Sequence, residues 1–249
     1  MDGVKSLLAE YDRLCETASD EALEQWLKDT CARYDEAESG DVTGRAALYN
    51  ELGTFYRHRG VLDKGETAFR AARALLEMPV RTADEAGCCG KQNLMDGQYG
   101  AQTADHRESA DYATTLNNLA GLYRMAKRFE EAEALFAQAE SIYRADENTP
   151  KELLASCGNN LGLVYMDTGR WEEAAASFER ALEILRGAPE KEYERATTEG
   201  NMAVALARLG RTNEARGHIA AASEIFKRLL GPDSEVCKSM AFLEQVLGA

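Results

Sequence analysis

The sequence predicts an all-α protein built from stacked helical hairpins, and three observations predict this class. Only four prolines occur among the 249 residues, and the helix-forming residues Ala, Leu, Glu and Arg dominate the composition. Almost no stretch alternates polar and apolar residues at the period of a β-strand. Four segments repeat one apolar pattern with helical spacing, which is typical of proteins made of stacked repeats.

The first element is expected to be an irregular helical hairpin over residues 1–40. Residues 3–15 and 20–37 each have the pattern of a helix, the second of them around Trp26 and Tyr34. This hairpin is expected to cap the stack, because terminal units with a polar outer face keep a stack of repeats soluble.

Four repeats follow, and each contains two helices. They span residues 46–78, 113–146, 155–188 and 196–231. Aligned without gaps, the repeats begin at Ala46, Ala113, Ala155 and Ala196. Positions 8, 20 and 27 then hold only Gly or Ala, whereas positions 7, 11 and 24 hold large apolar or aromatic residues. Small residues allow helices to cross closely, and the large side chains fill the space between layers.

A turn is expected between the two helices of each repeat. It falls at Gly60, Gly169 and Gly210 in three repeats, and the second repeat has Lys127 at the equivalent position. Within each repeat, the apolar residues on either side of the turn recur every three or four positions, which indicates two amphipathic helices.

An insertion at 79–112 separates the first two repeats and has no helical periodicity. The starts of these repeats are 67 residues apart, whereas the later starts are 42 and 41 residues apart. The insertion is either a mobile loop or a flap that packs over a neighbouring binding surface. Cys88 and Cys89 lie at its centre, where such a pair could be oxidised or bind a thiophilic metal ion.

The last element is expected to be a capping helix over residues 235–248. Its inward side chains are expected to be Met240, Leu243 and Leu247. Polar residues such as Lys238 and Glu244 would then form the outer face of this helix.

The agreement of small and large positions in four copies resembles the tetratricopeptide repeat family over roughly residues 46–231. The spacing exceeds the roughly 34 residues of the standard unit, and TTLNNLAGLYR resembles the long repeats of kinesin light chains. The family's proline near the end of the second helix is absent here. The resemblance implies a right-handed superhelical α-solenoid that forms a single domain over residues 1–249. It also implies that the first helix of each repeat lines a concave groove.

The resemblance implies that positions 2, 5, 6, 9, 12 and 13 of the first helices face this groove. Asparagine recurs at position 6, as Asn118, Asn160 and Asn201. Because an amide both donates and accepts, a row of asparagines could bind the backbone of an extended peptide. The same amides could instead bond to a neighbouring helix and only fix the repeat geometry. At position 5, represented by Asn50, the structural role is favoured.

Arginines and apolar residues complete the predicted groove. These candidates are Arg57, His58, Arg124, Met125, Leu163, Met166 and Arg208. If the arginines face the groove, they favour a peptide that carries carboxylates. Alternatively, they are solvated or paired with neighbouring glutamates, as most surface arginines are.

We expect a non-catalytic adaptor that binds an extended peptide segment of a partner protein. The three histidines lie in different contexts, and no motif for a nucleophile, a metal ion or a phosphate is present, so neither an enzyme nor a cofactor is expected. Two alternatives remain: a sensor of a free signalling peptide, and thiol or metal chemistry at Cys88–Cys89.

Charge and hydropathy narrow the range of partners. The net charge of −14 disfavours binding to nucleic acid or to an anionic membrane. No apolar run approaches the roughly 20 residues that span a bilayer, and the first residues do not resemble a signal peptide. We therefore expect a cytoplasmic protein. The exposed ends of a short solenoid also allow two copies to pair as a homodimer.

Overall fold

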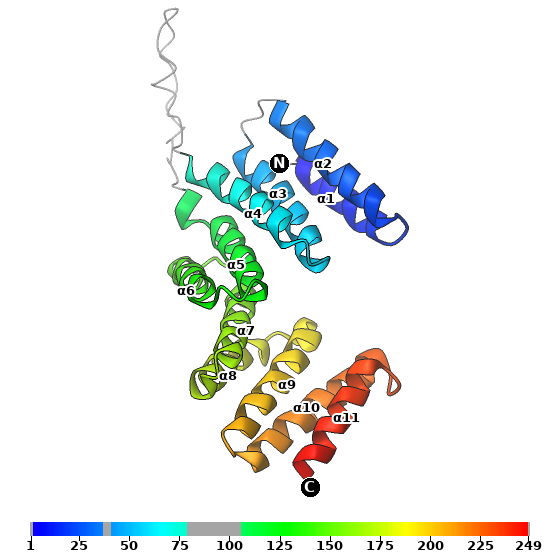
Figure 1. Ribbon diagram of the computed structural model, residues 1–249, viewed down its shortest axis with the longest axis vertical. Helices are drawn as coiled ribbons and strands as arrows, with labels where there is room; N and C mark the ends of the chain where they lie inside the picture. The colour runs from blue at the N-terminus through cyan, green and yellow to red at the C-terminus, as the bar shows by residue number, and fades with distance from the viewer. Residues whose placement is uncertain (1, 37–40, 79–105, 249) are drawn as a thin grey trace, which may run out of the picture. The chain divides into compact units, whose positions relative to one another are not determined.

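The computed structural model describes residues 2–36, 41–78 and 106–248 (Figure 1). Within these ranges all regular structure is helical, and no β-strand occurs. The predicted all-α class is therefore confirmed. Cys88 and Cys89, with most of the predicted insertion, lie outside the described residues.

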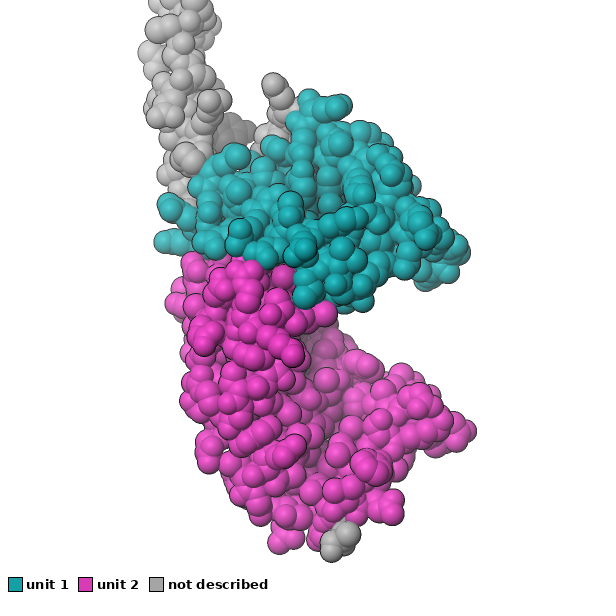
Figure 2. Space-filling model, in the orientation of Figure 1, with its two compact units in different colours: residues 1–115 teal, residues 116–249 magenta. Residues whose placement is uncertain are grey.

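The chain divides into two compact units, residues 1–115 and 116–249 (Figure 2). Unit 1 contains α1 (Asp2–Cys15), α2 (Asp20–Glu36), α3 (Val42–His58), α4 (Leu62–Glu77), the 3₁₀ helix η2 (His106–Glu108) and the start of α5 (Ala110–Met125). Unit 2 contains the end of α5, α6 (Phe129–Ala145), α7 (Lys151–Asp167), α8 (Trp171–Leu185), the 3₁₀ helix η3 (Pro189–Lys191), α9 (Glu192–Arg208), α10 (Thr212–Leu230) and α11 (Glu235–Gly248). The first turn of α5 occupies residues 110–112, which the sequence assigned to the insertion.

In unit 1, helices α1 and α2 lie where the sequence predicts an irregular hairpin. The rings of Tyr11 and Trp26 stack with their centroids 5.9 Å apart, which joins the two helices. Asp35 on α2 accepts hydrogen bonds from Arg45 Nε and Nη2, at 3.0 and 2.7 Å, and from the Tyr49 hydroxyl, at 2.6 Å. This charge-assisted cluster attaches α2 to α3.

Glycine at position 8 allows the two helices of a repeat to cross closely. A Cβ atom added at Gly162 on α7 would lie 2.5 Å from the Phe178 ring on α8. In unit 1, a Cβ atom added at Gly53 would lie 2.6 Å from the Phe69 ring. Both rings are fully buried. The small and large positions of the repeat therefore meet each other, as the sequence pattern predicts.

An arginine after the turn joins the two helices of a repeat, a feature not predicted from the sequence. The guanidinium of Arg128 lies 3.7 Å from the centroid of the Tyr123 ring, and that of Arg170 lies 4.3 Å from the Tyr165 ring. Arg170 Nη1 also donates to Glu133 of the preceding repeat at 2.7 Å. The sequence signal for this feature is the segment RFEE in one repeat and RWEE at the same place in the next.

Lys127 adopts a backbone conformation that glycine adopts in the other turns. Its φ is 59°, compared with 71°, 74° and 75° at Gly60, Gly169 and Gly210. A side chain in this left-handed region costs roughly 1–2 kcal/mol. We expect Lys127→Gly to raise the free energy of unfolding by about 1 kcal/mol, measured by urea denaturation. Gly169→Lys is the reciprocal control and should destabilise; a less stable Lys127→Gly protein would contradict the argument.

The C-terminal helix α11 packs against α10 and the core of unit 2. The predicted inward side chains are all partly buried against this core: Met240, Leu243 and Leu247. The outer face is less polar than expected, because Phe242 and Val246 are 65% and 54% exposed. Glu244 is exposed, and it also accepts a hydrogen bond from the Ser223 hydroxyl on α10 at 2.7 Å.

Candidate functional site

The recurring asparagines of unit 2 form hydrogen bonds between successive repeats. Asn160 Nδ2 on α7 donates to Asn117 Oδ1 on α5 at 3.3 Å. Asn201 Nδ2 on α9 donates to Asn159 Oδ1 on α7 at 3.1 Å. Position 6 of one repeat is therefore bonded to position 5 of the preceding repeat. We call these two bonds the asparagine pairs.

In each asparagine pair, one amide uses only its NH₂ group and the other uses only its oxygen. The side-chain oxygens of Asn160 and Asn201 and the NH₂ groups of Asn117 and Asn159 have no hydrogen-bond partner among the described residues. All four side chains are half-buried. Each of these four amides therefore has one intramolecular partner. The amide groups that remain unbonded are donors and acceptors of the kind that bind an extended peptide backbone.

Two further asparagines lie in other settings. Asn50, in unit 1, is buried and donates through Nδ2 to Thr115 Oγ1 at 2.8 Å. Its Oδ1 is buried and has no partner among the described residues. Asn118, in unit 2, is half-buried and makes no side-chain hydrogen bond to any residue that the structure describes.

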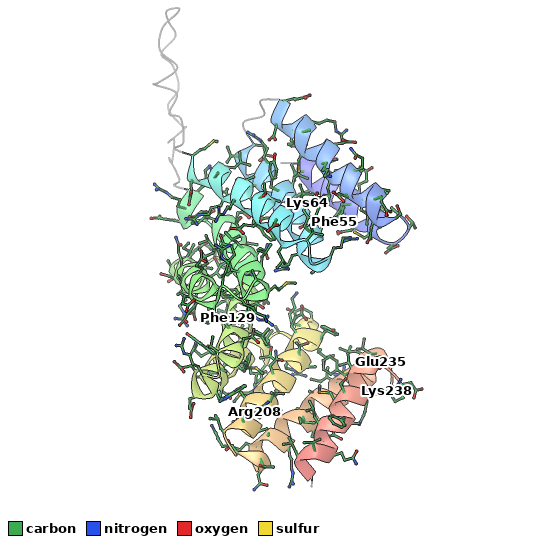
Figure 3. The ribbon with its side chains drawn as sticks, viewed as in Figure 1. Phe55, Lys64, Phe129, Arg208, Glu235 and Lys238 are labelled. Carbon is green, nitrogen blue, oxygen red and sulfur yellow. The ribbon has the colours of Figure 1, made fainter. Side chains whose placement is uncertain are left out.

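The candidate arginines lie in different local settings. Arg124 Nε lies 2.7 Å from Asp167 Oδ2 on the next first helix, so its charge is locally neutralised. Arg208 lies on α9 (Figure 3). Its guanidinium lies 5.4 Å from the centroid of the Trp171 ring. Arg57, in unit 1, is half-buried, and this burial lowers its pKa whereas the Glu51 carboxylate raises it. Of the two candidate arginines in unit 2, Arg124 is therefore paired with a carboxylate and Arg208 lies near an aromatic ring.

The other candidates differ in how accessible they are. Met125 is 48% exposed. Leu163 and Met166 are partly buried against the hydrophobic core of unit 2, so repeat packing already uses part of their surface. His58 is exposed as a residue, but partial desolvation of its ring, followed by the charges of Arg57 and Arg59, lowers its pKa.

A pocket of about 350 Å³ between α7 and α9 was not predicted from the sequence. Its lining residues come from α7, α8, η3 and α9: Glu152, Leu153, Ala155, Ser156, Asn159, Leu185, Lys191, Tyr193, Glu194, Thr197 and Thr198. All of them belong to unit 2, coloured magenta in Figure 2. Ser156 and Thr197 occupy position 2 of their repeats, and Asn159 belongs to an asparagine pair. The pocket therefore adjoins the surface that the repeat register assigns to binding.

Three of the four described cysteines are buried in the helical packing. Cys31, Cys157 and Cys237 are buried, and desolvation raises the pKa of both Cys31 and Cys157 to about 12. Cys15 is exposed. Among the residues that the structure describes, no group of three or more His, Cys, Asp or Glu side chains could hold a metal ion. In the same ranges, no helix has both the length and the apolar character needed to cross a membrane.

Residues 111–187 and 195–235 match models of the tetratricopeptide repeat. The chain contains tetratricopeptide repeats. These matches cover the second, third and fourth repeats predicted from the sequence, and the predicted resemblance is confirmed. The tetratricopeptide hairpins of unit 2 are α7–α8 and α9–α10, with α5 and α6 joined by the turn at residues 126–128.

Solved structures share this fold at low sequence identity. BtubC (BKLC) from P. vanneervenii is 20% identical over 92% of this chain and 83% of that chain, with a TM-score of 0.70. Repeats of a putative kinesin light chain from Podosopora anserina are 16% identical over 92% and 98%, with a TM-score of 0.63. The apo form of RapI is 14% identical over 99% and 78%, with a TM-score of 0.74. No curated protein matches the chain.

Proposed function

We propose that the chain is a non-catalytic adaptor that binds an extended segment of a partner protein on the first helices of unit 2. The tetratricopeptide fold suggests a protein–protein interaction adaptor. The observation that carries the finer proposal is the pair of asparagine bonds, which fix two amides per layer and leave a donor and an acceptor unused in each. Such preorganised amides can bind a peptide backbone without ordering new side chains.

The test replaces Asn118, Asn160 and Asn201 with alanine together. We expect the triple variant to keep its helical circular dichroism and to lose about 1 kcal/mol for each hydrogen bond removed. Partner capture from cell lysate, quantified by mass spectrometry, should fall strongly relative to the wild type. Asn148→Ala is the control, because Asn148 is exposed in the loop before α7 and bonds only to Asp146. Unchanged capture by a folded triple variant would contradict the proposal.

The cellular setting forms part of the same proposal. A cytoplasmic location, and no role in binding nucleic acid or membranes, rest on the net charge of −14 and the hydropathy pattern. The exposed Phe242 and Val246 side chains on α11 support the predicted homodimer through the ends of the stack.

A further inference from the structure

We propose that the pocket between α7 and α9 binds an arginine side chain of the partner segment. This inference rests on the proposed function, and it specifies which type of partner residue the pocket binds. Four features of the pocket support it: apolar walls, an unpaired carboxylate, an exposed aromatic ring, and free polar groups one and two turns along the same helix.

The walls of the pocket suit the aliphatic part of a long side chain. Ala155 and Leu185 are almost fully buried, and Leu153 is half-buried beside them in the lining. The methylene groups of an arginine can cover apolar surface of this kind while the charged end stays near water. A volume of about 350 Å³ leaves room for a long side chain.

The charged groups of the lining favour a cation. Glu152 is half-buried in the first turn of α7 and forms no ion pair with any residue that the structure describes. Glu194 is bonded to Lys191 at 3.3 Å, so that lysine charge is already partnered. The lining therefore presents one uncompensated carboxylate. A guanidinium matches a carboxylate with two parallel hydrogen bonds, which an ammonium group does not do.

An aromatic ring lies at the rim of the pocket. Tyr193 is 50% exposed, and its ring packs edge-on against Phe226 with the centroids 5.5 Å apart. The face of such a ring attracts a guanidinium. The chain itself uses this contact, since Arg59, Arg128 and Arg170 lie 3.6, 3.7 and 4.3 Å from the centroids of aromatic rings.

Polar groups on α7 can hold the backbone beside the bound side chain. Ser156 and Asn159 follow Glu152 by four and seven residues, which places all three on one face of the helix. The Ser156 hydroxyl is exposed, and neither it nor Asn159 Nδ2 donates to a described residue. Both groups can donate to the carbonyl oxygens of a peptide whose arginine fills the pocket.

The experiment compares blocked alanine heptapeptides that carry arginine, citrulline or glutamate at the central position. Binding is followed by ¹⁵N NMR titration of the 249-residue chain. We expect the arginine peptide to shift the resonances of Ser156, Asn159 and Thr197. The citrulline peptide has the same shape without the charge, so its affinity should be about tenfold lower. The glutamate peptide should not shift these resonances.

A matched pair of variants tests the role of the carboxylate. Glu152→Gln should reduce affinity for the arginine peptide about tenfold, and it should abolish the difference between arginine and citrulline. Glu183→Gln, an exposed site on α8 outside the pocket lining, removes the same charge and should change neither value. Circular dichroism establishes that both variants are folded.

Several outcomes would overturn the inference. Equal affinity for arginine and citrulline, shifts outside the pocket, or full binding by folded Glu152→Gln would each do so. Absence of binding by all three peptides would also overturn it. If partner capture still depended on Asn118, Asn160 and Asn201, only the pocket proposal would fail and the proposed function would be retained. If capture did not depend on those residues, the proposed function would fail whatever the pocket binds.

Discussion

Replacing Gly162 with alanine is expected to lower the free energy of unfolding by about 2 kcal/mol. The added Cβ atom would lie 2.5 Å from the Phe178 ring, which is fully buried in the close-packed core and would have to shift. Overpacking of this kind costs typically 1–3 kcal/mol, which exceeds the roughly 1 kcal/mol that alanine gains over glycine in a helix interior. Urea denaturation followed by circular dichroism measures the change.

Gly217→Ala is the matched control for this prediction. Gly217 lies inside α10, is exposed, and no atom would lie within 4 Å of an added Cβ atom. The same substitution should therefore stabilise the protein by about 0.5–1 kcal/mol, because only the helix propensity changes. If both variants gained stability, the close approach of Gly162 to Phe178 would not constrain the fold.

Phe178→Ala is expected to have the largest effect, a loss of about 3–5 kcal/mol in the free energy of unfolding. The side chain is fully buried in the core of unit 2, where α8 crosses α7 and α9, and its removal leaves a cavity. Thermal and urea denaturation measure the loss. Phe129→Ala, at the partly exposed start of α6, removes the same side chain from a less buried site and should cost less.

The double variant Gly162→Ala/Phe178→Ala separates local packing from a general loss of stability. The alanine at position 162 would enter the space that the phenyl ring vacates, so the double variant should be more stable than the sum of the two single effects predicts. Strict additivity would mean that the clash at Gly162 involves groups other than Phe178.

Contacts within one repeat could be predicted because both helices belong to one continuous segment of the sequence. The glycine and phenylalanine at positions 8 and 24 meet as the pattern indicates, and Lys127 adopts the same turn as Gly169. Local periodicity determines these contacts, since helix geometry fixes which side chains share a face.

Contacts between repeats were harder to predict because they depend on the offset of one helix against the next. The sequence shows asparagines at positions 5 and 6, but it does not show that Asn160 reaches Asn117 or that Arg124 reaches Asp167. The pocket depends in the same way on how α9 packs beside α7. An alignment of the repeats does not show how far apart two helices lie.

Under the proposed function, the asparagine pairs would limit the length of a bound segment. After Asn201 the series ends, because position 5 of the same repeat is Gly200 and α11 carries no asparagine. Gly200 lies close to Met240, where a Cβ atom would be 3.6 Å from the sulfur. A partner that binds these amides would therefore make its last asparagine contact at α9. Only a short stretch of the partner's sequence would then be constrained by this contact.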